Sequence, residues 1–341
     1  MAVSIPVRFS ERWQQLRLQA QMARAWFMQR YQTQPRFRLA TRIAGGLVLL
    51  YALIWLTFGR NLPSAESLLT YQPPLPTYVR DVNGVPVHSY ARERRVELRY
   101  AEYPPRLIEA FISAEDKTFF DHGGIDFPGL AGAVVDYVSK IGSGERARGG
   151  STITQQVAKN LLLGNEYSIT RKVKEAILAR RIESVLTKEQ ILELYLNQIP
   201  LGRNSFGVQA AARAYFNKDV TDLSLPEMAF LAILPKAPET YGRKRNEQRA
   251  LERRDYVLRA MRDNGYISAA EYQAATQTAL GILPRAATAS NLQMGGYFLE
   301  EVRRELIEKF GENSEAGPNS VYDGGLWVRA SINPDYQRYA E

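Results

Sequence analysis

The sequence predicts a mainly α-helical protein with a small β-rich stalk and one transmembrane helix near the N-terminus. Three observations predict this fold class. An uncharged apolar run follows an arginine-rich tail, an Asn-Gly pair separates two short alternating segments, and helical periodicity with repeated capping boxes fills most of the remaining chain. The 341 residues are 45% hydrophobic and 23% charged, a composition that folds around a globular core.

The positive charge is concentrated in the first 42 residues. The whole chain carries 44 Lys and Arg against 36 Asp and Glu, for a net charge of +8. Residues 1–42 hold eight arginines and one acid, so they contribute +7 of that total. Nucleic-acid binding needs cations spread along the folded surface. The distribution therefore disfavours a nucleic-acid partner and indicates a basic cytoplasmic tail beside a membrane.

Residues 43–59 predict the transmembrane helix. These 17 uncharged residues span about 25 Å at ~1.5 Å per residue, the short end of what a bilayer core requires. The arginines before the run predict a cytoplasmic N-terminus, and Trp55 and Phe58 suit the far interface. A cleaved signal peptide is disfavoured by the long leader, and a buried core helix by the basic flank. The rest of the chain is expected on the periplasmic or extracytoplasmic face of the cytoplasmic membrane.

The patterning then changes from strand-like to helical near Pro105. Residues 60–105 predict the stalk, because Asn83-Gly84 between alternating runs is a strong hairpin signal. Residues 106–285 predict a helical domain, with helices expected at 152–163, 171–186, 188–196, 209–216, 225–234 and 246–263. Its capping boxes are Thr187 with Gln190, Ser224 with Glu227, and Ser268 with Glu271. Residues 286–341 predict a looser linker with a helix at 296–310 and a strand at 326–332.

Composition restricts metal and thiol chemistry. The chain has no cysteine and only two histidines, His88 and His122. These numbers exclude a disulfide framework, a thiolate nucleophile and a cysteine-type zinc site. A metal ion would therefore need oxygen ligands.

The first candidate catalytic feature is the carboxylate pair Glu115-Asp116. It closes an apolar helical face and is followed by Phe119, Phe120 and His122. A carboxylate beside apolar groups binds its proton more tightly, which suits it to take a proton from an alcohol. The alternative is that both are solvated residues at a helix end.

The helix start expected after Gly149-Gly150 predicts an anion site. Its polar residues are Ser151, Thr152, Gln155, Gln156 and Lys159. Glycines allow close backbone approach, and the free N–H groups of a first helical turn favour an anion. The alternative is a capped helix after a flexible loop.

A second group of cations supports an anionic ligand. Arg171, Lys172 and Lys174 follow Thr170, a candidate N-cap, and the macrodipole of a first turn opposes cations unless an external anion such as phosphate compensates them. Glu175 shares a face with Lys172, where it can orient the lysine or bind a metal that accompanies the phosphate. The alternative is a solvated basic helix with an internal ion pair.

Two weaker patterns lie further along the chain. One set, on the flank and at the end of a helix, is Lys188, Ile191, Tyr195 and Asn197. Such residues more often pack and cap than bind ligands. Arg253-Arg254 before Val257-Leu258 most simply predicts an exposed basic turn over a buried apolar pair.

Together these features resemble the peptidoglycan glycosyltransferase domain, family 51 of the glycosyltransferases, found in class A penicillin-binding proteins. The resemblance extends over roughly residues 60–285 and rests on five ordered motifs. The matching residues are Glu115, Asp116, Phe119, His122 and Gly124; Gly149, Ser151, Thr152, Gln155 and Gln156; Arg171, Lys172 and Glu175; Lys188, Ile191, Tyr195 and Asn197; and Arg253, Arg254, Val257 and Leu258.

The resemblance implies a lysozyme-like fold and an enzyme that polymerises lipid II into β-1,4-linked glycan, inverting the anomeric carbon and releasing undecaprenyl pyrophosphate. By the same resemblance, Glu115 is the general base and Glu175 the assisting catalytic carboxylate, with Mg²⁺ or Mn²⁺ as a candidate cofactor and no organic cofactor. The implied substrate-binding residues are Asp116, Ser151, Thr152, Gln155, Gln156, Lys159, Arg171 and Lys172. The implied partners are lipid II, the growing lipid-linked glycan, membrane lipids and other cell-wall synthesis proteins.

Elementary chemistry favours the same reaction. A diphosphate leaving group is a weak base, so it needs neutralising cations rather than a proton donor. A glycoside hydrolase expels a sugar alkoxide and needs a general acid as well. Beside Glu115, the apolar stretch expected either to dip into the bilayer or to pack in the core comprises Phe119, Phe120, Ile125, Phe127 and Leu130.

The chain departs from the family pattern in two places. Many relatives carry a basic residue where this chain has Tyr167, so one phosphate contact is expected to be missing or supplied by Arg171. The sequence also contains no S-x-x-K tetrad of a transpeptidase, while residues 328–341 resemble the linker towards that domain. A truncated or divided bifunctional protein, without transpeptidase activity in this chain, is therefore expected.

Two other classes of function are open on the sequence. A muramidase or lytic transglycosylase has the same implied fold, but a neutral polysaccharide gives the cations at 171–174 nothing to bind. An inactive membrane scaffold for wall synthesis would not need the intact catalytic and anion-site residues.

Overall fold

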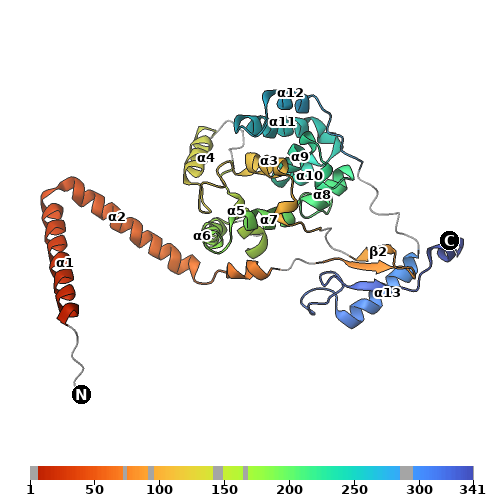
Figure 1. Cartoon of the computed structure of the whole chain (residues 1–341), viewed down its shortest axis with the longest axis horizontal. Helices are drawn as coiled ribbons and strands as arrows, with labels where there is room; N and C mark the ends of the chain where they lie inside the picture. The colour runs from red at the N-terminus through yellow and green to blue at the C-terminus, as the bar shows by residue number, and fades with distance from the viewer. Residues whose placement is uncertain are drawn as a thin grey trace, which may run out of the picture. The chain divides into compact units, whose positions relative to one another are not determined.

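The computed structural model describes residues 7–71, 75–90, 96–140, 149–163, 168–284 and 295–340. Two compact units make up the chain, Met1–Leu62 and Pro63–Glu341. The described part is mainly helical, as the sequence predicted, with one small sheet (Figure 1). Tyr167, at which the chain departs from the family pattern, lies outside the described residues.

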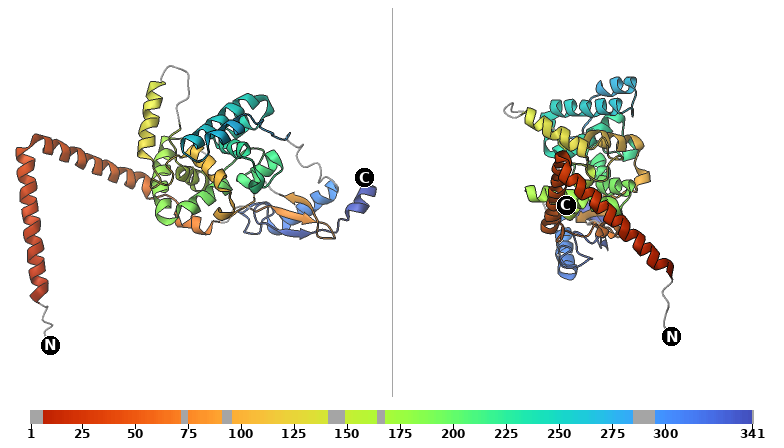
Figure 2. Two further views of the ribbon diagram at one scale, coloured as in Figure 1. Left: turned by 45° about the horizontal axis from the view of Figure 1, so that its top comes forward. Right: turned by 90° about the vertical axis from the view of Figure 1, so that its left-hand side faces the viewer.

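The N-terminal unit consists of two helices joined at a corner. α1 (Val7–Thr33) ends just before α2 (Pro35–Ile54), and one turn of π-helix, η1 (Trp55–Gly59), continues α2. Figure 2 shows α1 turning away from the line of α2. The break falls where Pro35 begins a new helix with no N–H to donate to the preceding turn.

Helix α2 and its π-helical turn form the candidate membrane span. Pro35–Gly59 has 25 residues and a mean hydropathy of 1.8, with none of its apolar window buried in the structure. The predicted span, residues 43–59, lies within this helix. Arg36, Arg38 and Arg42 occupy its first two turns, so the basic flank is part of the helix itself.

The second unit has a helical body formed by two groups of helices (Figure 1). Its helices are α3 (Pro105–Glu115), α4 (Phe127–Ser139), α5 (Ile153–Val157) with the π-turn η4 (Ala158–Leu162), α6 (Ile169–Val185), α7 (Lys188–Gln198), α8 (Val208–Phe216), α9 (Leu225–Ile233), α10 (Pro238–Tyr241), α11 (Glu247–Asp263) and α12 (Ala269–Thr276). Shorter 3₁₀ turns are η2 (Glu66–Thr70), η3 (Tyr100–Glu102), η5 (Val220–Asp222), η6 (Leu234–Lys236) and η7 (Lys244–Asn246). In the first group α3, α9 and α11 pack together, and in the second α5 packs against α6 and α7.

Local sequence signals explain most of these boundaries. The three predicted capping boxes, which begin at Thr187, Ser224 and Ser268, are all confirmed. The predicted cap Thr170 is wrong, because Ser168 caps α6 and accepts a hydrogen bond from the Arg171 N–H at 3.1 Å. Helix α4 was not predicted by periodicity, because it is apolar on nearly every side.

The small sheet brings together the two ends of the second unit. β1 (Thr77–Arg80) pairs antiparallel with β2 (Pro86–Tyr90) through the predicted hairpin, whose Gly84 has a φ of 84°. β3 (Trp327–Arg329) lies parallel to β1, so the sheet order is β2-β1-β3. The later helices are α13 (Gly296–Phe310) and α14 (Pro334–Ala340). Leu299 of α13 packs in the same buried cluster as Val79 and Tyr90 of the sheet.

Candidate active site

Glu115 is the last residue of α3 and lies where the two helix groups meet. The apolar face of α3 is buried as predicted, and this burial fixes the end of the helix. Gln156, from the second group, donates a hydrogen bond from Nε2 to Oε2 of Glu115 at 2.7 Å. Burial raises the pKa of the Glu115 carboxyl, while the Gln156 bond and the nearby Arg253 and Lys236 charges oppose the rise without cancelling it. A carboxylate with a raised pKa suits the predicted role of proton acceptor.

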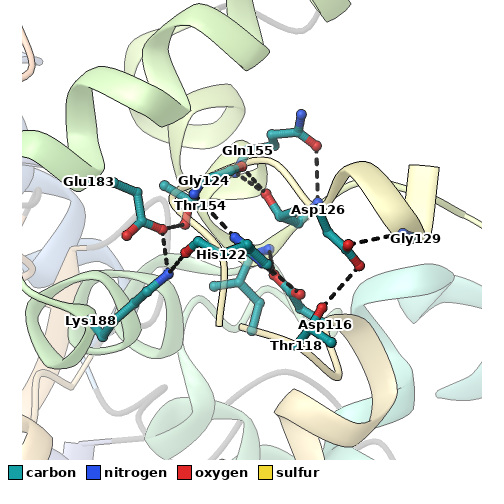
Figure 3. A network of polar contacts seen from close by, with 12 residues as sticks. Asp116, Thr118, His122, Gly124, Asp126, Gly129, Thr154, Gln155, Glu183 and Lys188 are labelled. Carbon is teal, nitrogen blue, oxygen red and sulfur yellow. Dashed lines mark hydrogen bonds and ion pairs between the residues drawn. The ribbon is translucent and has the colours of Figure 1, made fainter. Parts of the chain in front are cut away.

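Asp116 belongs to a polar network with His122 and its neighbours (Figure 3). Its carboxylate accepts hydrogen bonds from His122 Nε2 at 3.0 Å and from the backbone N–H of Ile153 at 2.9 Å. His122 Nδ1 accepts from the Gly124 N–H at 3.1 Å, which assigns the ring proton to Nε2. Burial raises the pKa of Asp116, and these two hydrogen bonds oppose the rise. Asp116 therefore joins the end of α3 to the start of α5.

Lys188 and Glu183 complete this network from α7 and α6 (Figure 3). Lys188 Nζ donates to the carbonyl oxygen of His122 and to Glu183 Oε1, each at 2.7 Å, and lies 4.3 Å from the Phe119 ring centroid. Thr154 donates to the same Glu183 oxygen at 2.6 Å. The packing alternative for the motif around Lys188 is thus confirmed, because the lysine fixes the turn after Asp116.

The start of α5 is a closed cap. Thr152 Oγ1 accepts from the Gln155 N–H at 3.2 Å, and Gln155 Oε1 accepts from the Thr152 N–H at 3.0 Å. The Thr152 hydroxyl also donates to the Gly124 carbonyl at 2.8 Å. The N–H groups of Ile153 and Gln155 are therefore already bonded, so the expectation that this first turn offers them to an anion is wrong. Thr152 and Gln155 fix the turn between Ser151 and α5, the helix that carries Gln156.

The predicted cations meet around Glu175. This carboxylate is only 1% exposed and pairs with Arg171 Nε at 3.0 Å and with Lys172 Nζ at 2.5 Å. Lys172 Nζ also donates a hydrogen bond to Ser151 Oγ at 2.9 Å. Burial lowers the pKa of half-buried Lys159, and the Glu175 charge opposes that change. The internal ion pair that the sequence left open is confirmed, and it still leaves two positive charges for one negative.

A cavity of about 690 Å³ contains Glu115 and connects the two helix groups. Ser151 and Gln156 line one wall of it. Lys172 reaches this wall through its hydrogen bond to Ser151. The carboxyl of Glu115 therefore shares one cavity with Ser151, and through Ser151 this cavity adjoins the cation group around Glu175.

The first helix group adds basic and aromatic residues to the lining of this cavity, and of these only Arg253 was singled out from the sequence. Lys236 follows α9, and Arg253, Tyr256 and Arg259 lie on α11. Arg253, Tyr256 and Arg259 are three residues apart, so they share one face of α11, whose other face is buried. This helical spacing is the sequence signal that could have indicated them. Only packing of α3, α9 and α11 brings them to Glu115.

Arg254 is a correction to the predicted exposed basic turn. Both arginines lie on helix α11, and Arg254 is 0% exposed. Its Nη2 donates to the Thr276 carbonyl at 3.0 Å and its Nη1 to the Thr278 carbonyl at 2.5 Å. These carbonyls at the end of α12 lack helical partners, and a buried guanidinium supplies them. Val257 and Leu258 are buried as predicted.

Helix α4 presents an exposed apolar surface beside the cavity. Its large apolar side chains that are at least 55% exposed are Phe127, Val134, Val135, Tyr137 and Val138. Of the apolar stretch predicted earlier, Phe120 is 52% and Leu130 45% exposed. Phe119 is 0% exposed, so it packs in the core and the membrane alternative is wrong for this residue. Asp136 of α4 and Lys140, the residue that caps its C-terminal end, line the cavity, which therefore opens next to this apolar surface.

The fold and site define a mainly helical protein with a candidate catalytic carboxylate, Glu115, in a cavity that Lys236, Arg253 and Arg259 also line. A family model described as Transglycosylase matches residues 83–262, more than half of the chain. The chain belongs to this transglycosylase family, and the resemblance to the family 51 glycosyltransferase domain is confirmed.

Curated relatives agree with this family. The chain is 42% identical over 284 residues to penicillin-binding protein 1A of Rickettsia felis, covering 83% of this chain and 35% of the relative. It is 39% identical over 283 residues to penicillin-binding protein 1A of Aquifex aeolicus, covering 83% of this chain and 37% of the relative. A crystal structure of penicillin-binding protein 1A from Haemophilus influenzae aligns with 28% identity and a TM-score of 0.46, covering 79% of this chain and 28% of that one. The chain spans about a third of the length of the curated relatives it matches.

Proposed function

We propose that this protein is a peptidoglycan glycosyltransferase that polymerises lipid II into β-1,4-linked glycan strands. The observation that carries the proposal is Glu115, a carboxylate of raised pKa in a 690 Å³ cavity that Lys236, Arg253 and Arg259 also line, with a second cation group joined to Ser151. Membership of the transglycosylase family supports it.

The proposed reaction is one displacement. Glu115 removes the proton from the 4-hydroxyl of the acceptor sugar, and the resulting oxygen attacks the anomeric carbon of the lipid-linked donor. The bond from that carbon to the diphosphate breaks, the diphosphate keeps the electron pair, and the carbon is inverted. Because the leaving group is a weak base, no proton donor is required. Asp116, the next residue in the chain, accepts hydrogen bonds from His122 and Ile153.

The cations provide the second part of the mechanism. Arg171, Lys172 and Lys159 would neutralise the diphosphate as it leaves. Glu175 is proposed to act through Arg171 and Lys172, because it pairs with both and is 1% exposed. It thus holds the cations in place, while its single negative charge leaves the group net positive. Ser151, Gln156 and the loop fixed by Thr152 and Gln155 would contact the sugars.

The expected divalent cation does not have a clear donor set in the protein. No group of three acidic or histidine side chains that could hold a metal occurs among the described residues. Both oxygens of Glu175 face cationic side chains. A Mg²⁺ or Mn²⁺ ion brought by the substrate diphosphate remains a prediction, and no step of the proposed mechanism depends on it.

The membrane supplies the substrate in this proposal. Pro35–Gly59 would cross the cytoplasmic membrane once, with the arginine-rich N-terminus in the cytoplasm and the second unit on the periplasmic or extracytoplasmic face. The exposed apolar side chains of α4 would enter the outer leaflet beside the cavity, where the lipid chain of the substrate arrives. Growing lipid-linked glycan and other wall-synthesis proteins are the proposed partners.

The experiment measures lipid II polymerisation and lipid II binding separately on the full chain in vesicles. Substituting only Arg171 and Lys172 would leave the buried carboxylate of Glu175 without an ion-pair partner, which would destabilise the folded protein. A triple variant, Arg171→Gln, Lys172→Gln and Glu175→Gln, removes the cations together with their acid. Lys309→Gln is the control, because Lys309 is an exposed lysine of α13 that pairs with Glu305. We expect the triple variant to lose turnover by 10-fold or more at an unchanged Tm, with the control unaffected.

Other outcomes would contradict the proposal. Turnover of the triple variant equal to that of the wild type would refute the role of these cations. Shortening of finished, lipid-free glycan by the wild type would favour a lytic enzyme, and binding of lipid II without turnover would favour a scaffold.

A further inference from the structure

A second cavity of about 770 Å³ adjoins the cavity that contains Glu115. The two share Lys236, Arg253 and Tyr256 in their linings. The second cavity, here named the distal cavity, continues past these residues to Tyr241 of α10 and Arg249 of α11. The cavity that contains Glu115 is here named the catalytic cavity. A substrate in it can therefore extend into the distal cavity without leaving the groove.

The distal cavity is positively charged. Lys236, Arg249 and Arg253 line it, and Glu252 is the one acid among its described lining residues. Arg253 lies with its guanidinium carbon 4.4 Å from the Tyr256 ring centroid. Its Nε atom is buried and finds no hydrogen-bond partner among the described residues. A buried donor without a partner is costly, so an anionic or carbonyl ligand at this position would satisfy it.

The position of the distal cavity restricts what it binds. The catalytic cavity borders the apolar helix α4 through Asp136 and Lys140, whereas no residue of α4 lines the distal cavity. A lipid-linked diphosphate must stay near the membrane and hence near α4. The distal cavity is therefore suited to the part of the substrate most remote from the lipid, and neutral sugar alone does not account for its three cations.

We propose that the distal cavity binds a carboxylate of the peptide carried by the glycan substrate. The inference rests on the proposed function, since it assumes a peptide-bearing sugar in the catalytic cavity. Lys236, Arg249 and Arg253 supply the charge, and Arg253 links the two cavities because its charge also acts on Glu115. Tyr241 and Tyr256 provide flat apolar surface for the peptide chain between its carboxylates.

Two lipid II preparations test this proposal, one with free peptide carboxylates and one with the same carboxylates converted to amides. Their Kd and KM are measured with the full chain in neutral vesicles at low salt, since salt screens exposed charges. Arg249→Gln is the informative variant because Arg249 lines only the distal cavity. Arg245→Gln is the matched control, an exposed arginine near α11 that lines neither cavity.

We expect Arg249→Gln to raise Kd and KM for the free-carboxylate lipid about threefold, the size of one partly exposed ion pair. Its kcat should change less than twofold, and the loss should vanish on the amidated lipid. Glu252→Gln should change Kd in the opposite direction, because it removes the opposing negative charge. Arg245→Gln should match the wild type on both lipids.

Equal Kd values for the two lipids in the wild type, or an equal loss on both lipids in Arg249→Gln, would overturn the inference. Failure of the proposed function is seen separately. A wild-type protein that binds lipid II with the expected carboxylate preference but never polymerises it would refute the polymerase and leave the peptide site standing.

Discussion

Replacing Glu115 with Gln separates the chemical role of this residue from its structural one. In the wild type, Oε2 of Glu115 accepts a 2.7 Å hydrogen bond from Gln156 Nε2. A glutamine at position 115 keeps the shape and can accept the same bond with its amide oxygen. The variant therefore loses the proton acceptor while the junction between α3 and α5 is preserved.

The expected loss of turnover is roughly 10²–10⁴-fold, the usual contribution of a general base. This corresponds to about 3–5 kcal/mol in the activation free energy, at ~1.36 kcal/mol per tenfold. The loss of turnover should not exceed this range, because the cations around Glu175 and on α11 remain in place. Substrate affinity should change little, since the removed function operates in the transition state.

The stability of the same variant has a predictable sign. Burial raises the pKa of Glu115 in the folded protein, so the unfolded chain releases this proton at lower pH than the folded chain. Ionisation of Glu115 therefore destabilises the fold as the pH rises from the ordinary value of 4.5 through the raised pKa. At neutral pH Glu115→Gln removes this penalty, and its Tm should equal or exceed that of the wild type.

The assay follows glycan product from lipid II in vesicles, with circular dichroism and thermal unfolding as controls. Turnover by folded Glu115→Gln within threefold of the wild type would refute the assignment of Glu115 as the base. A large loss of turnover together with a fall in Tm would show that the residue was needed for the fold instead.

Three further predictions concern the surroundings of Glu115. Gln156→Ala removes a hydrogen bond that lowers the Glu115 pKa, so the acid limb of the kcat/KM profile, where the base becomes protonated, should move to higher pH; an unmoved limb would contradict the link. Asp116→Asn leaves one acceptor oxygen for the two donors His122 Nε2–H and Ile153 N–H, so it should cost about 1–3 kcal/mol of stability and lower the Tm by several degrees. An unchanged Tm in thermal denaturation would show that this network is not needed for stability. Val135→Asp, at a side chain that is 69% exposed, should leave the Tm unchanged but reduce polymerisation in vesicles more than in detergent micelles; equal activity in both would argue against contact between α4 and the bilayer.

Local features were predictable because they depend on residues close together in the chain. The hairpin at Gly84 and the capping boxes of α7, α9 and α12 are each set within a few residues. The pairing of Glu175 with Arg171 and Lys172 follows from helical spacing of four and three residues. These contacts form wherever the helix forms, so the sequence pattern was sufficient.

Sequence reasoning was insufficient for side chains whose burial depends on contacts with other helices. Arg254 was expected at the surface, yet the end of α12 presents carbonyls that only a long buried donor reaches. For Phe119 the sequence leaves membrane contact and core packing equally open, and the structure shows core packing, with Lys188 Nζ 4.3 Å from the ring centroid. Residue type alone does not distinguish these environments, because the neighbours that bury each side chain come from other helices.

The sequence by itself determined the candidate membrane span, the helical class of the second unit, the family motifs and the choice of Glu115 as the candidate base. Only the tertiary structure decided which groups surround that carboxyl. Gln156, Lys236 and Arg253 are 41 to 138 positions away from residue 115, and they reach it because α3, α5, α9 and α11 bury their apolar faces against one another. The electrostatic environment of a buried carboxylate depends on such packing, which no spacing rule along the chain encodes.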